Sequence, residues 1–351
     1  MGKKYYLTNN IDLSGITWTP IGNLTPFKGE FDGRGFTISN LSFTSQAPYI
    51  GLFGEVSSAK ISNLNLTNFI INITFTSTTP LIGLLASNAS KTTIENCSIT
   101  SSSITTTYNN IFICGMLCGS YNKGTINKCY VSGNINNTNN LSSTSISYIG
   151  GFIGQSNTHT ITNSYSNVNF ITTSINFDSI GGLIGYGDSC NITACYSSGT
   201  MTYTNNSNTG KNLTYGGLIG RILSNLSTSS ITNSYYNSSG ITNTINRTLN
   251  SLYIGGLIGE TQGPNTLTIT NCYSATAITP SAVNTNNKLG GTIGFIVSGT
   301  NTASNTFYDN TLYTGTAIGD GLLSSGSITG TSTTNMKTLS TFTTAGWDFS
   351  I

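Results

Sequence analysis

The stretch SIGGLIGYGDSC at residues 179–190 holds four glycines in close succession. Alone it could be a phosphate-binding loop, because glycine clusters serve nucleotide loops, tight turns and close strand packing alike. The chain, however, repeats a similar five-residue word eight times, and eight phosphate loops in one chain are implausible. A repeat with a period of 31 to 39 residues indicates a solenoid, so we interpret the glycine as a packing residue.

The eight glycine words share a glycine at their second position. They are IGLFG (50–54), IGLLA (82–86), CGMLC (114–118), GGFIG (150–154), GGLIG (181–185), GGLIG (216–220), GGLIG (255–259) and GGTIG (290–294). The second-position glycines are Gly51, Gly83, Gly115, Gly151, Gly182, Gly217, Gly256 and Gly291.

A second word follows each glycine word, and one extra copy precedes the first. Its nine copies are ISNLSF (38–43), ISNLNL (61–66), IENCSI (94–99), INKCYV (126–131), ITNSYS (161–166), ITACYS (192–197), ITNSYY (231–236), ITNCYS (269–274) and ASNTFY (303–308). A looser strand rich in Ile and Thr comes next. Three strand-like words per period, separated by Gly, Asn and Ser, predict an all-β chain that forms a right-handed parallel β-helix of about nine turns.

Alternation along the glycine word predicts which side chains face the core. Large apolar residues stand two positions before and two positions after the second-position glycine, so all three positions are expected to point inward. The residue between the glycine and the following apolar residue would then point outward and form an apolar stripe, our candidate interface. Its members are Leu52, Leu84, Met116, Phe152, Leu183, Leu218 and Leu257. The alternative is that the glycines bend the strand and this column enters the core at a corner.

Two columns of the second word carry Asn and Cys. Asn tolerates a positive φ at a bend, and stacked Asn side chains hydrogen-bond from turn to turn. The Asn column is Asn40, Asn63, Asn96, Asn163, Asn233, Asn271 and Asn305, interrupted by Lys128 and Ala194. The next column places Cys97, Cys129, Cys195 and Cys272 where other turns have Leu, Ser or Thr. Parallel Cβ vectors suit a disulfide poorly, so we predict buried reduced thiols, which fit assembly in a reducing compartment.

The composition excludes several classes of function. Only 7% of the 351 residues are charged and the net charge is +2 without a basic run, so no nucleic-acid partner is expected. No apolar run approaches the ~18 residues of a membrane span. The start, MGKKYYLTNN, has no apolar stretch behind its lysines, so no signal peptide is expected. Retention at the site of synthesis and export by another route are both left open.

The ends differ from the repeats. Residues 1–37 contain Trp18 and a Phe cluster, and residues 311–351 contain Trp347. We predict caps over the open ends of the solenoid at 1–37 and 311–351, with the β-helix repeats at 38–310.

Those end segments carry a resemblance to a known family. IDLSGITWTPIG (11–22), FKGEFDGRGFTISNL (27–41) and GLFG (51–54) resemble the start of GLUG-repeat β-helix regions in bacterial surface adhesins and filamentous-haemagglutinin-like proteins. The same repeats occur in the non-catalytic part of IgA-cleaving zinc proteases, and MKTLSTFTTAGWDFSI (336–351) resembles the segment that closes such arrays. The resemblance implies a right-handed β-helix used as a stalk, adhesin or scaffold at a surface. The protease's H-E-x-x-H motif is absent, since the chain has one His.

A catalytic or metal site would need clustered acids, bases or ligands. Glu30 and Asp32 share a strand face, but Lys28 and Arg34 beside them favour a solvated ion cluster. Asp178 and Asp188 flank one glycine word and form the only pair in the middle of the solenoid. Cys114-x3-Cys118 lacks the partner ligands of a zinc site, and His159 lies one turn away. We therefore expect no catalytic, metal or cofactor-binding residues.

A structural role is the first functional hypothesis. An uncharged rod with an apolar stripe is suited to self-association or to decorating a fibre, shell or surface layer, with copies of itself or neighbouring subunits as partners. The alternative is an adhesin that binds a glycan or host surface through the variable Asn/Thr loops. A polysaccharide-acting enzyme and an ice-binding protein are further alternatives; the Ile/Thr strand is too irregular in length to favour the latter.

Overall fold

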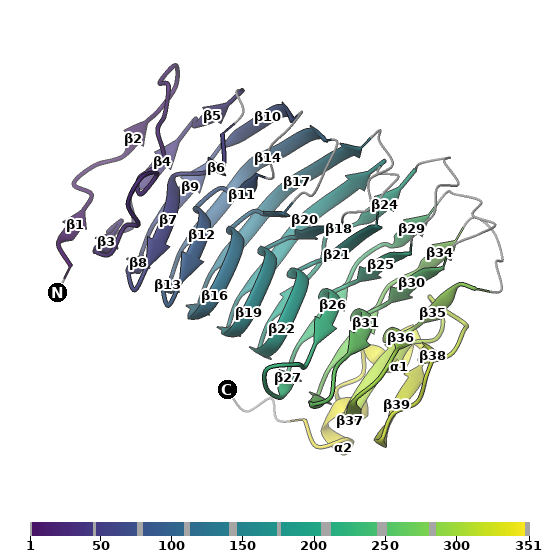
Figure 1. Cartoon of the computed structure of the whole chain (residues 1–351). Coiled ribbons are helices and arrows are strands. Elements are labelled where there is room, and N and C mark those ends of the chain that lie inside the picture. Colours follow the sequence, from purple (N-terminus) through teal and green to yellow (C-terminus); the bar gives the residue numbers. More distant parts are fainter. Residues whose placement is uncertain are drawn as a thin grey trace.

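The chain forms a parallel β-solenoid with almost no helix (Figure 1). The computed structural model describes residues 2–44, 47–75, 80–108, 113–139, 146–173, 177–204, 212–243, 251–280 and 286–347. Successive turns lie side by side from the purple N-terminal end to the yellow C-terminal end. The predicted fold class is confirmed.

The strands belong to two parallel sheets. The eight-stranded sheet contains β6 (Tyr49–Ile50), β11 (Leu81–Gly83), β15 (Ile113–Gly115), β18 (Ile146–Gly150), β21 (Phe177–Gly181), β25 (Leu213–Gly216), β30 (Leu252–Gly255) and β35 (Lys288–Gly290). The 31-stranded sheet wraps around the rest of each turn. Its strands that follow the glycine bend are β7 (Phe53–Ser57), β12 (Ala86–Ser90), β16 (Cys118–Asn127), β19 (Ile153–Thr162), β22 (Ile184–Thr193), β26 (Ile219–Leu223), β31 (Ile258–Gln262), β36 (Ile293–Ile296) and β38 (Ile318–Asp320).

The second word and the looser third strand supply the remaining strands of this sheet. The separate strands that lead into the Asn bend and end there are β1 (Lys4–Tyr6), β3 (Glu30–Asp32), β8 (Lys60–Ser62), β13 (Thr93–Glu95), β27 (Ser229–Thr232) and β32 (Thr266–Thr270). In the last turn β37 (Thr300–Asp309) continues through the bend. The strands beyond that bend are β2 (Ile11–Asp12), β4 (Thr37–Ser39), β9 (Asn65–Thr67), β14 (Ser98–Tyr108), β17 (Tyr130–Asn139), β20 (Tyr165–Thr172), β23 (Tyr196–Ser197), β28 (Tyr235–Asn237) and β33 (Tyr273–Ala275). The third-strand positions are completed by β5 (Ser42–Phe43), β10 (Ile70–Phe75), β24 (Met201–Tyr203), β29 (Ile241–Asn243) and β34 (Ile278–Pro280). At the C-terminal end follow β39 (Ser325–Thr331) and two short helices, α1 (Thr333–Met336) and α2 (Leu339–Thr344).

The solenoid makes about seven turns, so the predicted count of nine was wrong. Nine copies of the second word were counted, but the copy at 38–43 and the last copy lie outside complete turns. Eight strands of the smaller sheet enclose seven intervals, from Tyr49 to Gly290.

Each glycine word is divided between the two sheets. Ile180 and Gly181 belong to β21, whereas Ile184 begins β22 in the other sheet. A bend at Gly182 and Leu183 separates the two strands. The glycines that pair across the sheet are Gly83, Gly115, Gly150, Gly181, Gly216, Gly255 and Gly290, one residue earlier than predicted in the last five turns.

This register changes which residues point inward in the first turns. Ile50, Ile82 and Cys114 are fully buried, whereas their predecessors in sequence, Tyr49, Leu81 and Ile113, were expected in the core and are only half-buried. The paired column continues through Ile149 and Ile180, which are buried as predicted. Backbone pairing aligns the first glycine of each later word, and so the second glycine is available to form the bend.

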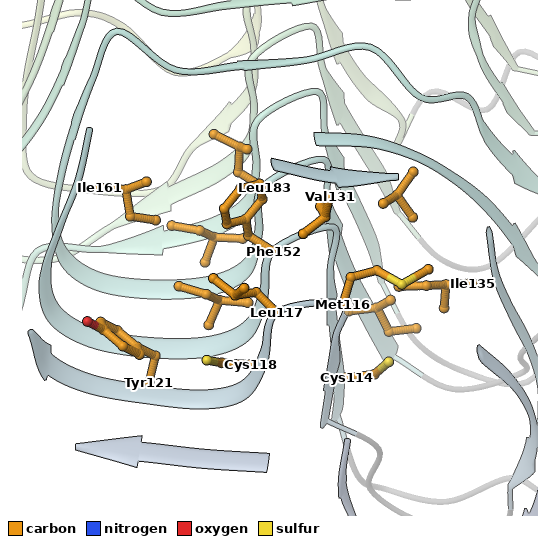
Figure 2. Packing of buried hydrophobic residues seen from close by; sticks show 14 of the residues in the cluster. Cys114, Met116, Leu117, Cys118, Tyr121, Val131, Ile135, Phe152, Ile161 and Leu183 are labelled. Atoms are coloured by element: carbon orange, nitrogen blue, oxygen red, sulfur yellow. The ribbon is translucent and has the colours of Figure 1, made fainter. Parts of the chain in front are cut away.

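The core is one continuous apolar cluster along the solenoid. Figure 2 shows how side chains from successive turns fill the space between the strands, with Leu117, Phe152 and Leu183 one above another. The inward residues of strands on all sides meet there, since Ile161 and Val131 approach from the second word. Burial of such a stack supplies most of the stability of a repeat protein.

The two ends contact the neighbouring turns through aromatic residues. The Trp18 Nε1–H donates to Leu52 O at 3.1 Å, and the ring centroids of Phe27 and Phe53 are 5.3 Å apart. At the other end, Trp347 Nε1–H donates to Asn305 O at 3.0 Å, and Phe342 packs on Phe307. These contacts attach both segments to the repeats; the division into caps and repeats stays a prediction.

Candidate functional site: a tyrosine ladder with one open end

Five tyrosines stack along the outside of the solenoid. Each one directly follows the inward Cys or Ser column of the second word, so strand alternation turns its ring outward. The ladder consists of Tyr130, Tyr165, Tyr196, Tyr235 and Tyr273. Successive ring centroids are 4.3, 4.6, 4.8 and 4.7 Å apart. The last three pairs are stacked face to face, with interplanar angles of 7°, 2° and 3°, so Tyr196 and Tyr235 have both faces covered. The Tyr130 ring is tilted by 33° from that of Tyr165.

The C-terminal end of the ladder is closed. Phe307 takes the next register position after Tyr273. Phe342 and Trp347 lie 5.9 and 6.2 Å from the Tyr273 ring, centroid to centroid. Burial raises the pKa of the Tyr273 hydroxyl, as it does for Tyr196 and Tyr235. These three hydroxyls are therefore uncharged at neutral pH.

The N-terminal end is open. The register partner of Tyr130 in the preceding turn is Ser98, which in turn pairs with Asn65, so no ring continues the ladder in that direction. A hollow of about 340 Å³ lies here. It is lined by Asn65, Asn96, Cys97, Ser98, Lys128, Cys129, Tyr130, Asn163 and Tyr165. Small side chains at Ser98 and Asn65 thus leave room beside an aromatic ring.

The Asn column runs beside the ladder from Asn63 to Asn305. These eight positions have a positive φ, including Lys128 and Ala194, as predicted for the bend. Asn40, predicted as the first member, lies at a different bend: it follows β4, which pairs with β9, and Asn68 Nδ2 donates to Asn40 Oδ1 at 2.7 Å. Where Asn residues follow one another, Nδ2 donates to the Oδ1 of the preceding turn: Asn96 to Asn63 at 2.8 Å and Asn305 to Asn271 at 3.1 Å. The ladder of amides is broken at Lys128, and Asn163 donates instead to Asn127 Oδ1 at 3.0 Å.

Lys128 is the charged residue of the hollow. Its side chain is exposed, and no Asp or Glu lines the hollow. Within the described part of the chain the ion pairs are Lys4–Glu30, Lys60–Glu95, Arg221–Glu260 and Lys288–Asp320, so Lys128 is in none of them. The hollow therefore combines an aromatic ring, several amides and one cation without a counter-ion.

The candidate interface predicted from the sequence is buried. Every member has at most 1% of its surface exposed, so the column cannot form a contact surface on the outside. This corrects the assignment of Leu52, Leu84, Met116, Phe152, Leu183, Leu218 and Leu257 as interface residues. The physical reason is the bend at each glycine word, which interrupts strand alternation and turns two consecutive apolar residues inward. Figure 2 shows Met116 and Leu117 both inside the solenoid.

The acids considered for catalysis have structural contacts. Asp188 is buried, and its Oδ1 accepts from Ser189 Oγ at 2.9 Å and from the Asn225 N–H at 3.0 Å. The carboxylate therefore fixes the backbone at Asn225, in the next turn of the solenoid. Asp178 lies in β21, and its side chain falls outside the described part.

The acids near the N-terminus are also engaged. Glu30 pairs with Lys4 at 2.8 Å rather than with Lys28. Asp32 accepts from the Arg34 N–H and from Asn63 Nδ2, both at 2.9 Å, which lowers its pKa. Hydrogen bonds to neighbouring turns and an exposed ion pair account for both carboxylates.

The cysteines and the histidine are internal. All seven thiols are free and buried, as predicted for Cys97, Cys129, Cys195 and Cys272. Burial raises the pKa of Cys195 and Cys272 to about 12. His159 is buried next to Tyr121, and burial lowers its pKa to about 4. Among the described residues, no three His, Cys, Asp or Glu side chains are placed to hold a metal ion.

One buried ion pair was not found from the sequence. Arg221 Nη2 lies 3.2 Å from Glu260 Oε1 and donates to Gln262 Oε1 at 2.6 Å. Burial raises the pKa of Glu260, against the opposing effect of Arg221. The signal was present, since both residues directly follow the trailing glycine of successive glycine words. Their contact connects two turns.

Hydroxyl columns are present on the strands of the second word and, over three turns, on the looser strand at Thr202, Thr242 and Thr279. One column is Thr160, Asn191, Ser230, Thr268 and Thr302, and its neighbour is Thr162, Thr193, Thr232, Thr270 and Ser304. Several of these side chains bond one another along the solenoid, such as Ser304 to Thr270 at 3.3 Å and Ser230 to Asn191 at 2.8 Å. These contacts stabilise the stack, and Asn191 interrupts the hydroxyl repeat.

The fold resembles that of proteins described as immunoglobulin A1 proteases. An IgA1 protease matches over 86% of this chain, with a TM-score of 0.50 and 18% identity, and this chain spans only 20% of that protein. An immunoglobulin A1 protease-like protein of Bacteroides ovatus matches with a TM-score of 0.46 and 18% identity, over 86% of this chain and 78% of its own. No protein-family model and no curated protein matches the chain. Among the described residues there is no helix long and apolar enough to cross a membrane.

Proposed function

We propose that this β-helix is a non-catalytic surface module that binds a glycan in the hollow beside Tyr130. The observation that carries the proposal is the open end of the tyrosine ladder, where Tyr130 and Tyr165 border a hollow lined by amides. The C–H face of a pyranose packs well on an aromatic ring, and amide side chains both donate to and accept from sugar hydroxyls. Sites of this kind combine aromatic walls with a few placed polar groups.

This proposal keeps the adhesin alternative, but it places the binding surface on the strands that carry the tyrosine ladder. The sequence suggested the variable Asn/Thr loops, whereas the ladder is built on the regular strands β17 and β20, which position side chains more rigidly than loops do. The resemblance to surface adhesins and the likeness to IgA1 proteases support a surface role at the level of fold. Neither similarity supports assigning the protease's activity to this chain.

Self-assembly, our first hypothesis from the sequence, loses the surface on which it depended. Its partner-binding stripe was the column that contains Leu183 and Leu218, and both residues are fully buried. A structural role in a larger assembly is retained here only as the scaffold on which the glycan site is displayed.

A glycan array with the purified chain tests the proposal. We expect binding that Tyr130→Ser abolishes, because Ser98 already occupies this register position in the preceding turn and the fold should accept serine. Tyr130→Phe should keep most of the affinity, since it retains the ring. Tyr235→Ser, which removes an inner ring far from the hollow, is the control and should bind as the parent does. Binding that Tyr130→Ser leaves intact would place the site elsewhere.

A further inference from the structure

Lys128 occupies a position that disfavours lysine. Its φ is 52°, in the left-handed region that Asn and Gly adopt readily and that is unfavourable for other residues. Its register neighbours, Asn96 and Asn163, have the same backbone conformation and carry the preferred residue. A lysine at this position also cannot make the amide-to-amide hydrogen bond that joins Asn96 to Asn63 in the preceding turns. Asparagine would therefore stabilise the fold better than lysine does.

The strained lysine coincides with the open end of the tyrosine ladder. Lys128 and Tyr130 are two residues apart and line the same hollow. The nearest acid of the preceding turn along this edge, Glu95, is paired with Lys60 at 3.3 Å. Lys91 and Lys123 also have a positive φ, so it is the position of Lys128 in the lining of the hollow that points to a ligand. The cation is thus placed, at a cost in stability, where an aromatic ring and amides also meet.

We infer that the hollow recognises an acidic sugar, a pyranose that bears a carboxylate or sulfate group. The sugar ring would pack against Tyr130, and its anionic group would pair with the Lys128 ammonium. Asn96 and Asn163, on the two sides of Lys128, would meet the hydroxyls. This inference rests on the proposed glycan-binding function and specifies its ligand class. A charge-assisted contact in a partly enclosed hollow gives more selectivity than the same contact on an open surface.

The test compares Lys128→Asn with Ala194→Asn. Both changes place Asn at a positive-φ bend that interrupts the amide column, so both variants should have a raised midpoint of thermal unfolding. Only Lys128→Asn should weaken binding of acidic sugars, by about tenfold or more, and it should leave neutral sugars of the same ring unaffected. Glucuronate paired with glucose, and galactose 6-sulfate paired with galactose, are suitable probes. They also separate carboxylate from sulfate recognition.

The outcomes distinguish the two proposals. If Tyr130→Ser abolishes binding while Lys128→Asn leaves the ratio of acidic to neutral binding unchanged, the inference about the ligand is overturned and glycan binding stands. If neither change affects glycan binding, both proposals fail. Affinity of the parent for the acidic probe should also fall as salt rises, and a salt-independent affinity would contradict pairing with Lys128.

Discussion

Gly181 in strand β21 lies directly against the backbone of Gly220 in strand β26 of the next turn. A Cβ added to Gly181 would lie 2.5 Å from Gly220 N, and one added to Gly220 would lie 2.7 Å from Ile180 N. The same relationship joins Gly216 to Gly259 and later pairs. The strands of the two sheets can therefore approach this closely, inside the molecule, only because both columns lack side chains.

Gly181→Ala should consequently destabilise the solenoid strongly, because the new methyl group would overlap main-chain atoms that cannot move independently. We expect a loss of about 3 kcal/mol or more in the free energy of unfolding, measured by urea denaturation. Gly240→Ala is the matched control. Its added Cβ would meet nothing closer than 3.6 Å, so a change within about 1 kcal/mol is expected. Equal stability of the two variants would contradict the close approach of the sheets.

Leu183 should behave as a core residue. Its side chain is fully buried, so Leu183→Ala should cost about 2–5 kcal/mol of unfolding free energy. The double change Leu183→Lys with Leu218→Lys should unfold the chain, as seen by loss of the β-sheet signal in circular dichroism. A folded double variant that had only lost self-association would mean that this column faces outward after all.

His159 should make stability depend on pH. Its pKa is about 4 in the folded chain and about 6.5 when unfolded, so the unfolded chain binds the proton more strongly. The contribution is fully present above about pH 6.5 and is lost as pH falls toward 4, by about 3 kcal/mol in total. Leu267 occupies the same inward column in a later turn, so His159→Leu is a fitting control. The parent should lose more stability than the variant between pH 7 and pH 4, whereas parallel curves would show a solvated histidine.

The thiols should be unreactive until the chain unfolds. Burial holds the pKa of Cys195 and Cys272 at about 12, and Cys97 and Cys129 are buried in the same column. Alkylation followed by mass spectrometry should label none of these four in the native protein and all of them in denaturant. Recovery of a Cys97–Cys129 disulfide from native protein would refute the assignment.

The candidate site could be found only in part from the sequence. The Asn column, the cysteine column and the positions of Lys128 and Ala194 were all visible as repeats. The tyrosine beside the cysteine column was visible too. Its importance as the open end of a stack was not visible, because that end exists only where the preceding turn has Ser98 in place of an aromatic ring. A hollow depends on the volumes of side chains in adjacent turns, and Asn65, Ser98 and Tyr130 are more than 30 residues apart in succession.

The repeats are enough to specify a solenoid. Repeated strand words with inward Ile and positive-φ Asn specify turns that can bury their apolar residues only by stacking on one another. The direction of the Leu183 side chain depends on tertiary contacts, because regular alternation along the strand would turn it outward and a bend at the glycines turns it inward. The bend requires Gly181 to lie against Gly220 of the following turn. These residues are 39 positions apart, so the pattern within one glycine word does not reveal the contact. The register of the double glycines and the number of complete turns were settled in the same way, by backbone pairing between turns.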